Sequence, residues 1–200
     1  MSTQQKILVQ TFNLIMKYGI KSVSMDDISK GIGISKKTIY QHFENKRSLL
    51  ASVVDDHIAK DETEMSALID SSSNAIEEMV LIAKHVLTFL RGMSPSMMFD
   101  TKKYYPEIWH KVEEEHFTFI RNTVKANILR GQKEGLYLED GNAEIISLLY
   151  VRQTLALADE EIFPLSKFDR MELFKTMVTY HVRGLMSTEG RVVAKNYKIA

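Results

Sequence analysis

Helical periodicity runs through almost the whole chain and limits the fold more than any other feature of the sequence. Alternating β-branched segments, which would indicate strands, are missing apart from fragments such as "GLYLED" at 135–140, which we interpret as a loop. The sequence therefore predicts an all-α protein. The first helical stripe has the spacing of one face of an amphipathic helix and consists of Ile7, Leu8, Thr11, Phe12 and Ile15.

Capping residues place the ends of the helices. Ser24 with Asp27 matches a capping box for the second helix, and Ser166 with Asp169 is expected to cap the last one. We expect the tail, 187–200, to be frayed or loosely packed. The predicted helices span about 3–17, 25–31, 36–42, 45–69, 75–91, 106–134, 142–161 and 167–186.

Composition excludes several classes of protein. The 200 residues include no Cys, which excludes disulfides and thiol catalysis and favours a reducing, cytoplasmic location. No secretory signal and no apolar run of membrane-spanning length is visible, so we expect no membrane association. We also find no Gly-rich phosphate loop and no nucleophile elbow, and therefore expect no enzymatic activity.

Charge is distributed unevenly although the net charge is zero. Residues 1–50 contain eight Lys and Arg but three acidic residues, whereas the remainder contains 18 basic and 23 acidic residues. A basic N-terminal quarter on an acidic body indicates a polyanion as partner of the first segment.

The two short helices at 25–31 and 36–42 have the dimensions of a helix-turn-helix, with glycine in the turn. In that motif the second helix enters the major groove of DNA. Ile39 and Phe43 would anchor this helix, and its remaining positions carry no acid. Those outward positions are Lys36, Lys37, Thr38, Tyr40, Gln41 and His42.

Each outward side chain suits a contact with DNA. Lysine can donate to guanine, threonine can contact a thymine methyl group, and tyrosine and histidine can reach phosphates or base edges. Ser24 and Ser35 lie at helix N-termini, where free N–H groups bind phosphate, and Lys46 could hold the flanking backbone. The alternative is an ordinary solvated surface.

From Ile7 to Leu50 the chain resembles the DNA-binding domain of the tetracycline-repressor (TetR) family, through "SMDDIS", "SKKTIYQHF" and "NKRSLL". The resemblance implies a helix-turn-helix head, 1–48, and a larger helical body for ligand binding and dimerisation, 49–200. It implies that Lys36, Lys37, Thr38, Tyr40 and His42 face DNA, with Ser24 and Lys46 on phosphates. Lys37 replaces a residue that is often small in the family, and Glu44 should point away from DNA.

Aromatic and methionine side chains gather around the irregular segment 92–100, and we expect them to form the pocket of a partly apolar effector. Ordinary core packing is the alternative. The expected ligand-binding residues are Phe89, Met93, Met97, Phe99, Tyr104, Trp109 and Phe117. The "HKVEEEH" segment, 110–116, could place His and Glu pairs on one helix face, but solvated ion pairs explain it as well, and we expect no metal and no cofactor.

The last two long helices, within 142–186, carry more apolar residues than one helix face needs, and Gly184 permits close approach. In the family such helices pair with those of a second subunit, so we expect a homodimer through this region. The apolar candidates are Leu148, Leu149, Leu155, Phe174, Met177, Val178 and Leu185.

The resemblance implies a ligand-responsive homodimeric transcriptional regulator, with repression the family's commoner mode. Residues 24–46 would bind a palindromic double-stranded operator, and a small molecule in the body would release it. Two other functions are a DNA-binding regulator controlled by a protein partner and an all-helical enzyme. Thermal stabilisation by small molecules separates the first alternative from the leading hypothesis, and turnover of a metabolite would indicate the second.

Overall fold

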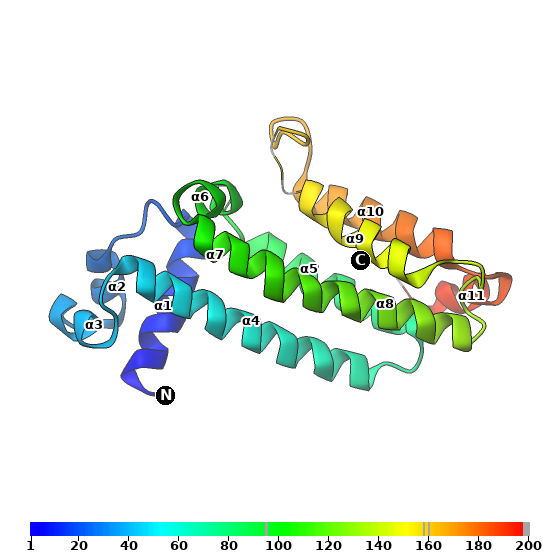
Figure 1. Ribbon diagram of the computed structural model, residues 1–200, viewed down its shortest axis with the longest axis horizontal. Helices are drawn as coiled ribbons and strands as arrows, with labels where there is room; N and C mark the ends of the chain where they lie inside the picture. The colour runs from blue at the N-terminus through cyan, green and yellow to red at the C-terminus, as the bar shows by residue number, and fades with distance from the viewer. Residues whose placement is uncertain (95, 158, 160, 198–200) are drawn as a thin grey trace. The chain divides into compact units, whose positions relative to one another are not determined.

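A computed structural model describes residues 1–94, 96–157, 159 and 161–197, and confirms an all-α fold in these residues (Figure 1). They contain no strand, and Tyr137 and Met186 form an isolated antiparallel bridge. None of their helices is long and apolar enough to cross a bilayer.

The chain forms two compact units. We call Met1–Asp61 with Gly92–Glu114 the head unit, and Glu62–Arg91 with Glu115–Ala200 the body unit. The segment 1–48 lies within the head unit, which also includes residues 49–61 and 92–114. The functional boundary after residue 48 stays a prediction.

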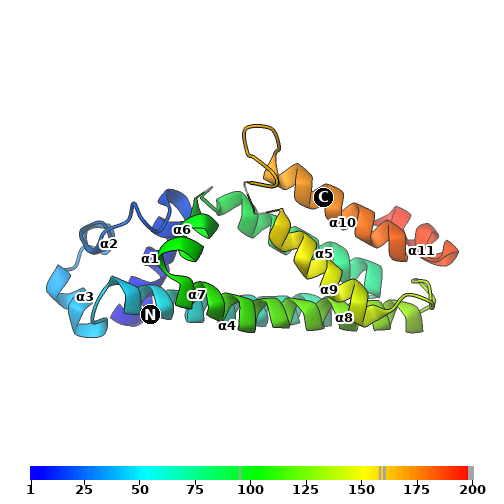
Figure 2. The same ribbon diagram turned by 45° about the horizontal axis from the view of Figure 1, so that its top comes forward.

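The head unit packs short helices around one apolar core. Figure 2 shows α1, α2 and α3 as the blue helices at the start of the chain. Ile7, Ile28, Ile39 and Leu49 are fully buried in its core. The helices are α1 (Thr3–Tyr18), α2 (Met25–Ile32), α3 (Lys36–His42), the start of α4 (Lys46–Ser71), α6 (Met97–Tyr104) and α7 (Pro106–Lys111).

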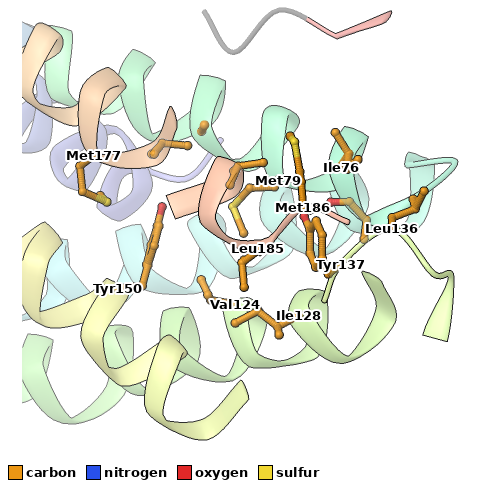
Figure 3. Packing of buried hydrophobic residues seen from close by; sticks show 14 of the residues in the cluster. Ile76, Met79, Val124, Ile128, Leu136, Tyr137, Tyr150, Met177, Leu185 and Met186 are labelled. Carbon is orange, nitrogen blue, oxygen red and sulfur yellow. Dashed lines mark hydrogen bonds between the residues drawn. The ribbon is translucent and has the colours of Figure 1, made fainter. Parts of the chain in front are cut away.

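The body unit has its own core, in which Ile76, Tyr137 and Met186 lie among other apolar side chains (Figure 3). A π-helical segment, Val112–His116, precedes α8, so the helix predicted over 106–134 is not regular throughout. The principal helices of the body are α5 (Ala75–Gly92), α8 (Phe117–Lys133), α9 (Ala143–Ala156), α10 (Arg170–Leu185) and α11 (Thr188–Val193), followed by a 3₁₀ turn, Ala194–Asn196.

Two expectations about the C-terminal region were wrong. Asp169 alone caps α10: its carboxylate accepts the N–H of Glu172 at 2.8 Å, so Ser166 is not part of the cap. The tail forms α11 and the 3₁₀ turn, and Tyr197 packs against the core of the body. Tertiary contacts therefore stabilise a helix that is too short to be stable alone. Residues 198–200 lie outside the described residues.

Candidate nucleic-acid interface

A complete capping box begins α2. The Ser24 hydroxyl accepts the N–H of Asp27 at 3.2 Å, and the Asp27 carboxylate accepts the N–H of Ser24 at 2.8 Å. Hydrogen bonds from the Ser24 hydroxyl and N–H lower the pKa of Asp27. The Ser24 hydroxyl is thus used to fix the start of α2, and Ser24, the predicted phosphate contact, remains exposed.

A tight turn joins α2 to α3. Gly33 ends α2 with φ of +69°, a left-handed conformation that glycine adopts without strain. The Ile34 N–H then bonds to the Ser29 carbonyl at 3.0 Å. Ser35 caps α3 by accepting the Thr38 N–H at 3.0 Å. Local hydrogen bonds therefore fix the direction in which α3 leaves the turn.

The helix α3 has one buried and one exposed side. Ile39 and Phe43 are buried in the core of the head, as expected. Tyr40 is 48% exposed. Lys36, Lys37 and His42 are also exposed, whereas Thr38 is half-buried. Four of the five predicted DNA-facing residues of α3 are therefore exposed, and Thr38 is the least accessible.

The exposed face of α3 has an acidic neighbour that the sequence pattern did not reveal. The Lys36 ammonium lies 2.7 Å from a carboxylate oxygen of Asp26, on the preceding helix. This pair raises the pKa of Lys36. Lys37, in contrast, makes no ion pair with any residue that the structure describes. Lys37 is thus the cation of α3 most available to a phosphate or a guanine.

Lys46 is engaged within the head. Its ammonium donates to the carbonyl of Ile20 at 2.6 Å, and burial lowers its pKa. An ammonium has three donors, so one bond to a carbonyl does not prevent a second bond to phosphate. The neighbouring Arg47 pairs with Glu107 and donates to the carbonyl of Tyr104 at 3.2 Å. The phosphate contact of Lys46 stays a prediction.

The residues expected to form the effector pocket are divided between the two units. Phe89 and Phe117 belong to the body. The other five, Met93, Met97, Phe99, Tyr104 and Trp109, belong to the head.

Three of the head aromatics carry lysines on their faces. Lys103 lies 5.1 Å from the ring centre of Phe99, Lys21 lies 5.1 Å from that of Tyr104, and Lys102 lies 4.7 Å from that of Trp109. Phe99 is also 58% exposed. Cation–π contacts at a surface account for part of this cluster, and its role in ligand binding stays a prediction.

The "HKVEEEH" segment contains one of the His–Glu pairs that the spacing predicted. His110 Nε2 lies 3.1 Å from Glu114, and both side chains are about two-thirds exposed. Among the described residues, no three His, Cys, Asp or Glu side chains gather as they would around a metal ion.

The expected dimer residues fall into three groups by exposure. Leu148 and Leu149, on α9, are 43% and 54% exposed. Leu155 is partly buried against the core of the body. The remaining four, Phe174, Met177, Val178 and Leu185, are buried in that core. These four are therefore already packed within a single chain.

Known proteins share both the head and the overall fold. Residues 7–53 match the family model described as bacterial regulatory proteins, tetR family. The chain is 23% identical over 189 residues to YvaF, a helix-turn-helix transcriptional regulator of Bacillus subtilis, covering 92% of this chain and 96% of YvaF.

Two solved structures show the same architecture. A transcriptional regulator from Saccharomonospora viridis, in complex with choline, superposes with a TM-score of 0.75 at 17% identity, over 92% of this chain and 97% of that one. FadR from Bacillus subtilis, in complex with stearoyl-CoA, has a TM-score of 0.68 at 18% identity, over 90% and 98%.

A helix-turn-helix head joined to a helical body defines a DNA-binding transcription regulator. Residues 7–53 are similar to the DNA-binding domain of the tetR family of bacterial regulatory proteins, and the whole chain is similar in sequence to a helix-turn-helix transcriptional regulator.

Proposed function

We propose that this protein is an effector-responsive homodimeric repressor that binds a palindromic operator through residues 24–46. The observation that carries the proposal is the exposed face of α3, on which Lys37 and Tyr40 stand clear of the head core while Ile39 is fully buried. A helix held in this way can enter the major groove without a change in the head.

The two helix starts support docking on the phosphate backbone. Ser24 and Ser35 begin α2 and α3, and both are exposed. The N–H groups of a first helical turn favour an anion, because they lack partners within the helix. Phosphate contacts at these positions would orient α3, while Lys37, Tyr40 and His42 contact base edges or flanking phosphates.

An exposed apolar surface on the body supports dimerisation. Ile145, Leu148 and Leu149 of α9 are 43–55% exposed, and Tyr180 of α10 is 76% exposed. A side chain added at Gly184 would meet no atom within 4 Å, so this part of α10 is open to a second chain. A two-fold dimer places two copies of α3 about one DNA turn, roughly 34 Å, apart.

The effector is proposed to act by differential binding to two conformations of the dimer. Fold neighbours contain choline and stearoyl-CoA, two ligands of different chemistry, so the fold does not specify the effector. A coupling of about 1–3 kcal/mol between effector and operator would be typical. The protein would lie in the cytoplasm with the DNA that it regulates.

The test is selection of bound duplexes from a random library, followed by titration of the best duplex at several salt concentrations. We expect a palindromic sequence bound by a dimer. Lys37→Ala should weaken binding and reduce the slope of log K against log[salt] by about 0.9 if Lys37 contacts a phosphate. Lys133→Ala removes an exposed lysine from the body and serves as the charge-matched control.

The ion pair between Asp26 of α2 and Lys36 of α3 offers a second variant for this experiment. Asp26→Asn removes the carboxylate that holds Lys36, and we expect tighter DNA binding with a steeper salt dependence. If neither Asp26→Asn nor Lys37→Ala changes DNA affinity, α3 does not face the DNA and the proposed interface is wrong.

A further inference from the structure

A cavity at the end of the body unit combines positive charge with apolar walls. It has a volume of about 670 Å³ and lies beside α10, α11 and the 3₁₀ turn, the orange and red segments of Figure 1. This volume is within the range of small-molecule sites, about 300–1,000 Å³. Its lining residues are Thr179, Arg183, Met186, Arg191, Ala194, Lys195 and Tyr197.

Among the described residues that line this cavity, Arg183, Arg191 and Lys195 are cations and none is acidic. Arg183, Arg191 and Lys195 are exposed and make no ion pair with any other residue in the described part of the chain. Elsewhere in the body, Arg121 and Lys125 both pair with Glu144, and Arg130 pairs with two glutamates. Unneutralised cations around one hollow repel one another, and a bound anion would relieve that repulsion.

The cavity also offers the contacts that an organic ligand needs. Met186 is buried, and Ala194 and Tyr197 are half-buried against the body core, so these three provide apolar surface. The Thr179 hydroxyl makes no hydrogen bond with a described residue and is a further polar group beside the cations. An anionic group would bind the arginines while an attached apolar group packs on the walls.

The walls of the cavity are fixed by packing rather than by the ligand. The Tyr197 hydroxyl accepts a hydrogen bond from the Asn74 side chain at 3.0 Å. At the start of α11, the Ser187 hydroxyl donates to the Gly135 carbonyl at 2.7 Å. A Cβ on Gly190 would lie 2.0 Å from the Leu136 carbonyl oxygen, so glycine at this position lets α11 pack closely against the backbone of Leu136. A preformed cavity loses little conformational freedom on binding.

We propose that this cavity binds a small organic anion, such as a phosphate ester with an apolar substituent. The two arginines and Lys195 hold the anionic group, and Met186, Ala194 and Tyr197 hold the remainder. The proposal goes beyond repression of an operator, because the binding needs no DNA. The site is also separate in residues from the exposed apolar surface around Leu149 and Tyr180.

The test is isothermal titration calorimetry of the full chain with phenyl phosphate, inorganic phosphate and phenol at one pH and ionic strength. We expect saturable binding of phenyl phosphate, weaker binding of phosphate and no measurable binding of phenol. The double variant Arg183→Gln, Arg191→Gln should weaken phenyl phosphate binding by at least about tenfold, because charged hydrogen bonds are lost. The control Lys133→Gln removes an exposed lysine outside the cavity and should change the affinity less than twofold.

Two results would contradict the proposed anion-binding site. One is the absence of saturable phenyl phosphate binding to the unmodified chain. The other is unchanged binding in the double variant, which would place the anion elsewhere. A glutamate-rich peptide that binds where phenyl phosphate does not would indicate an acidic protein partner and also contradict the proposal. Circular dichroism checks the fold of the double variant, and Lys195→Gln supplies an independent single change at an exposed position.

A negative result for anion binding would not contradict the proposed repressor function, because operator binding is tested separately, with DNA and variants of α3. Conversely, loss of DNA binding in Lys37→Ala would say nothing against the cavity. The two proposals can therefore be distinguished by which variants affect which ligand.

Discussion

Among single residues, the buried polar side chains of the body are held by specific hydrogen bonds. The Tyr137 hydroxyl lies 3.1 Å from the Ala75 carbonyl oxygen and 3.2 Å from the Asn127 side-chain oxygen, and burial raises the pKa of Tyr137. The Asn127 amide also donates to the Ala75 carbonyl at 2.8 Å. These bonds satisfy groups that would be costly to bury alone.

His181 is a half-buried titratable residue whose buried Nε2 lacks such compensation. Its Nε2 has no hydrogen-bond partner among the described residues, and its ring packs edge-on against Tyr150 with 4.7 Å between centres. Burial lowers the pKa of His181 to about 4. The folded protein therefore holds this imidazole neutral at a pH where the unfolded chain, with a pKa near 6.5, already binds a proton.

This difference predicts a pH dependence of stability. Between pH 6.5 and about pH 4 the unfolded state binds the extra proton, so stability falls as the pH falls, by at most about 1.4 kcal/mol per pH unit from this residue. His181→Phe removes the titration and should flatten that part of the profile. Urea unfolding at pH 7, 6 and 5, at constant protein concentration, measures the effect. Parallel profiles for the two proteins would contradict the assignment.

At the scale of elements, close approach explains where glycine is needed inside a helix. A Cβ on Gly131, in α8, would lie 2.1 Å from the Tyr137 ring, which hydrogen bonds hold in place. Gly92, at the end of α5, differs: a Cβ there would make only an ordinary contact, 3.8 Å from Met16 Cε. The two positions form a matched pair for testing the packing of α8.

Gly131→Ala should destabilise the protein although alanine favours helix. The gain in helix propensity is about 1 kcal/mol, whereas displacement of the Tyr137 ring is expected to cost more, for a net loss of about 1–3 kcal/mol. Gly92→Ala should be neutral or slightly stabilising. Thermal and urea unfolding of both variants measure the difference, and equal stabilities would show that the Tyr137 ring moves aside without cost.

At the scale of the whole molecule, the exposed leucines of α9 bear on assembly. Leu149 is 54% exposed, and Leu129 of α8 is 50% exposed, so the two are similarly accessible in one chain. The proposed dimer buries Leu149 and would leave the control position Leu129 in solvent. A charge placed at a buried interface is strongly unfavourable, whereas a charge placed in solvent costs little.

Leu149→Glu should therefore weaken the dimer by at least about 100-fold, and Leu129→Glu should leave it unchanged. Sedimentation velocity over a range of concentrations measures both. A dimer that persists in Leu149→Glu would place the interface on another surface, and a monomeric unmodified protein would remove the basis of the palindromic operator.

The ends of the two short helices in the head, α2 and α3, can be predicted from the sequence alone. Ser24 with Asp27, Ser35 and the glycine turn predict the ends of α2 and α3 to within about one residue, because caps and turns depend on neighbours three or four positions away. The fold class was predicted from helical periodicity along almost the whole chain, and the resemblance to the TetR family came from this segment. The predicted start of α10, at 167, was wrong because Ser166 with Asp169 has the spacing of a capping pair, whereas in the structure Asp169 itself is the cap.

Contacts between different elements could be found only in the folded structure. Residue spacing in the sequence did not predict three of these features. They are the pairing of Asp26 with Lys36, the close approach of α11 to Leu136 and the division of the aromatic cluster between two units. The same holds for the apolar residues of α9 and α10, where exposed Leu149 and buried Phe174 are equally hydrophobic in sequence. Local patterns fix which face of a helix is apolar, whereas long-range packing decides what that face contacts, and so the cationic cavity could be found only in the folded chain.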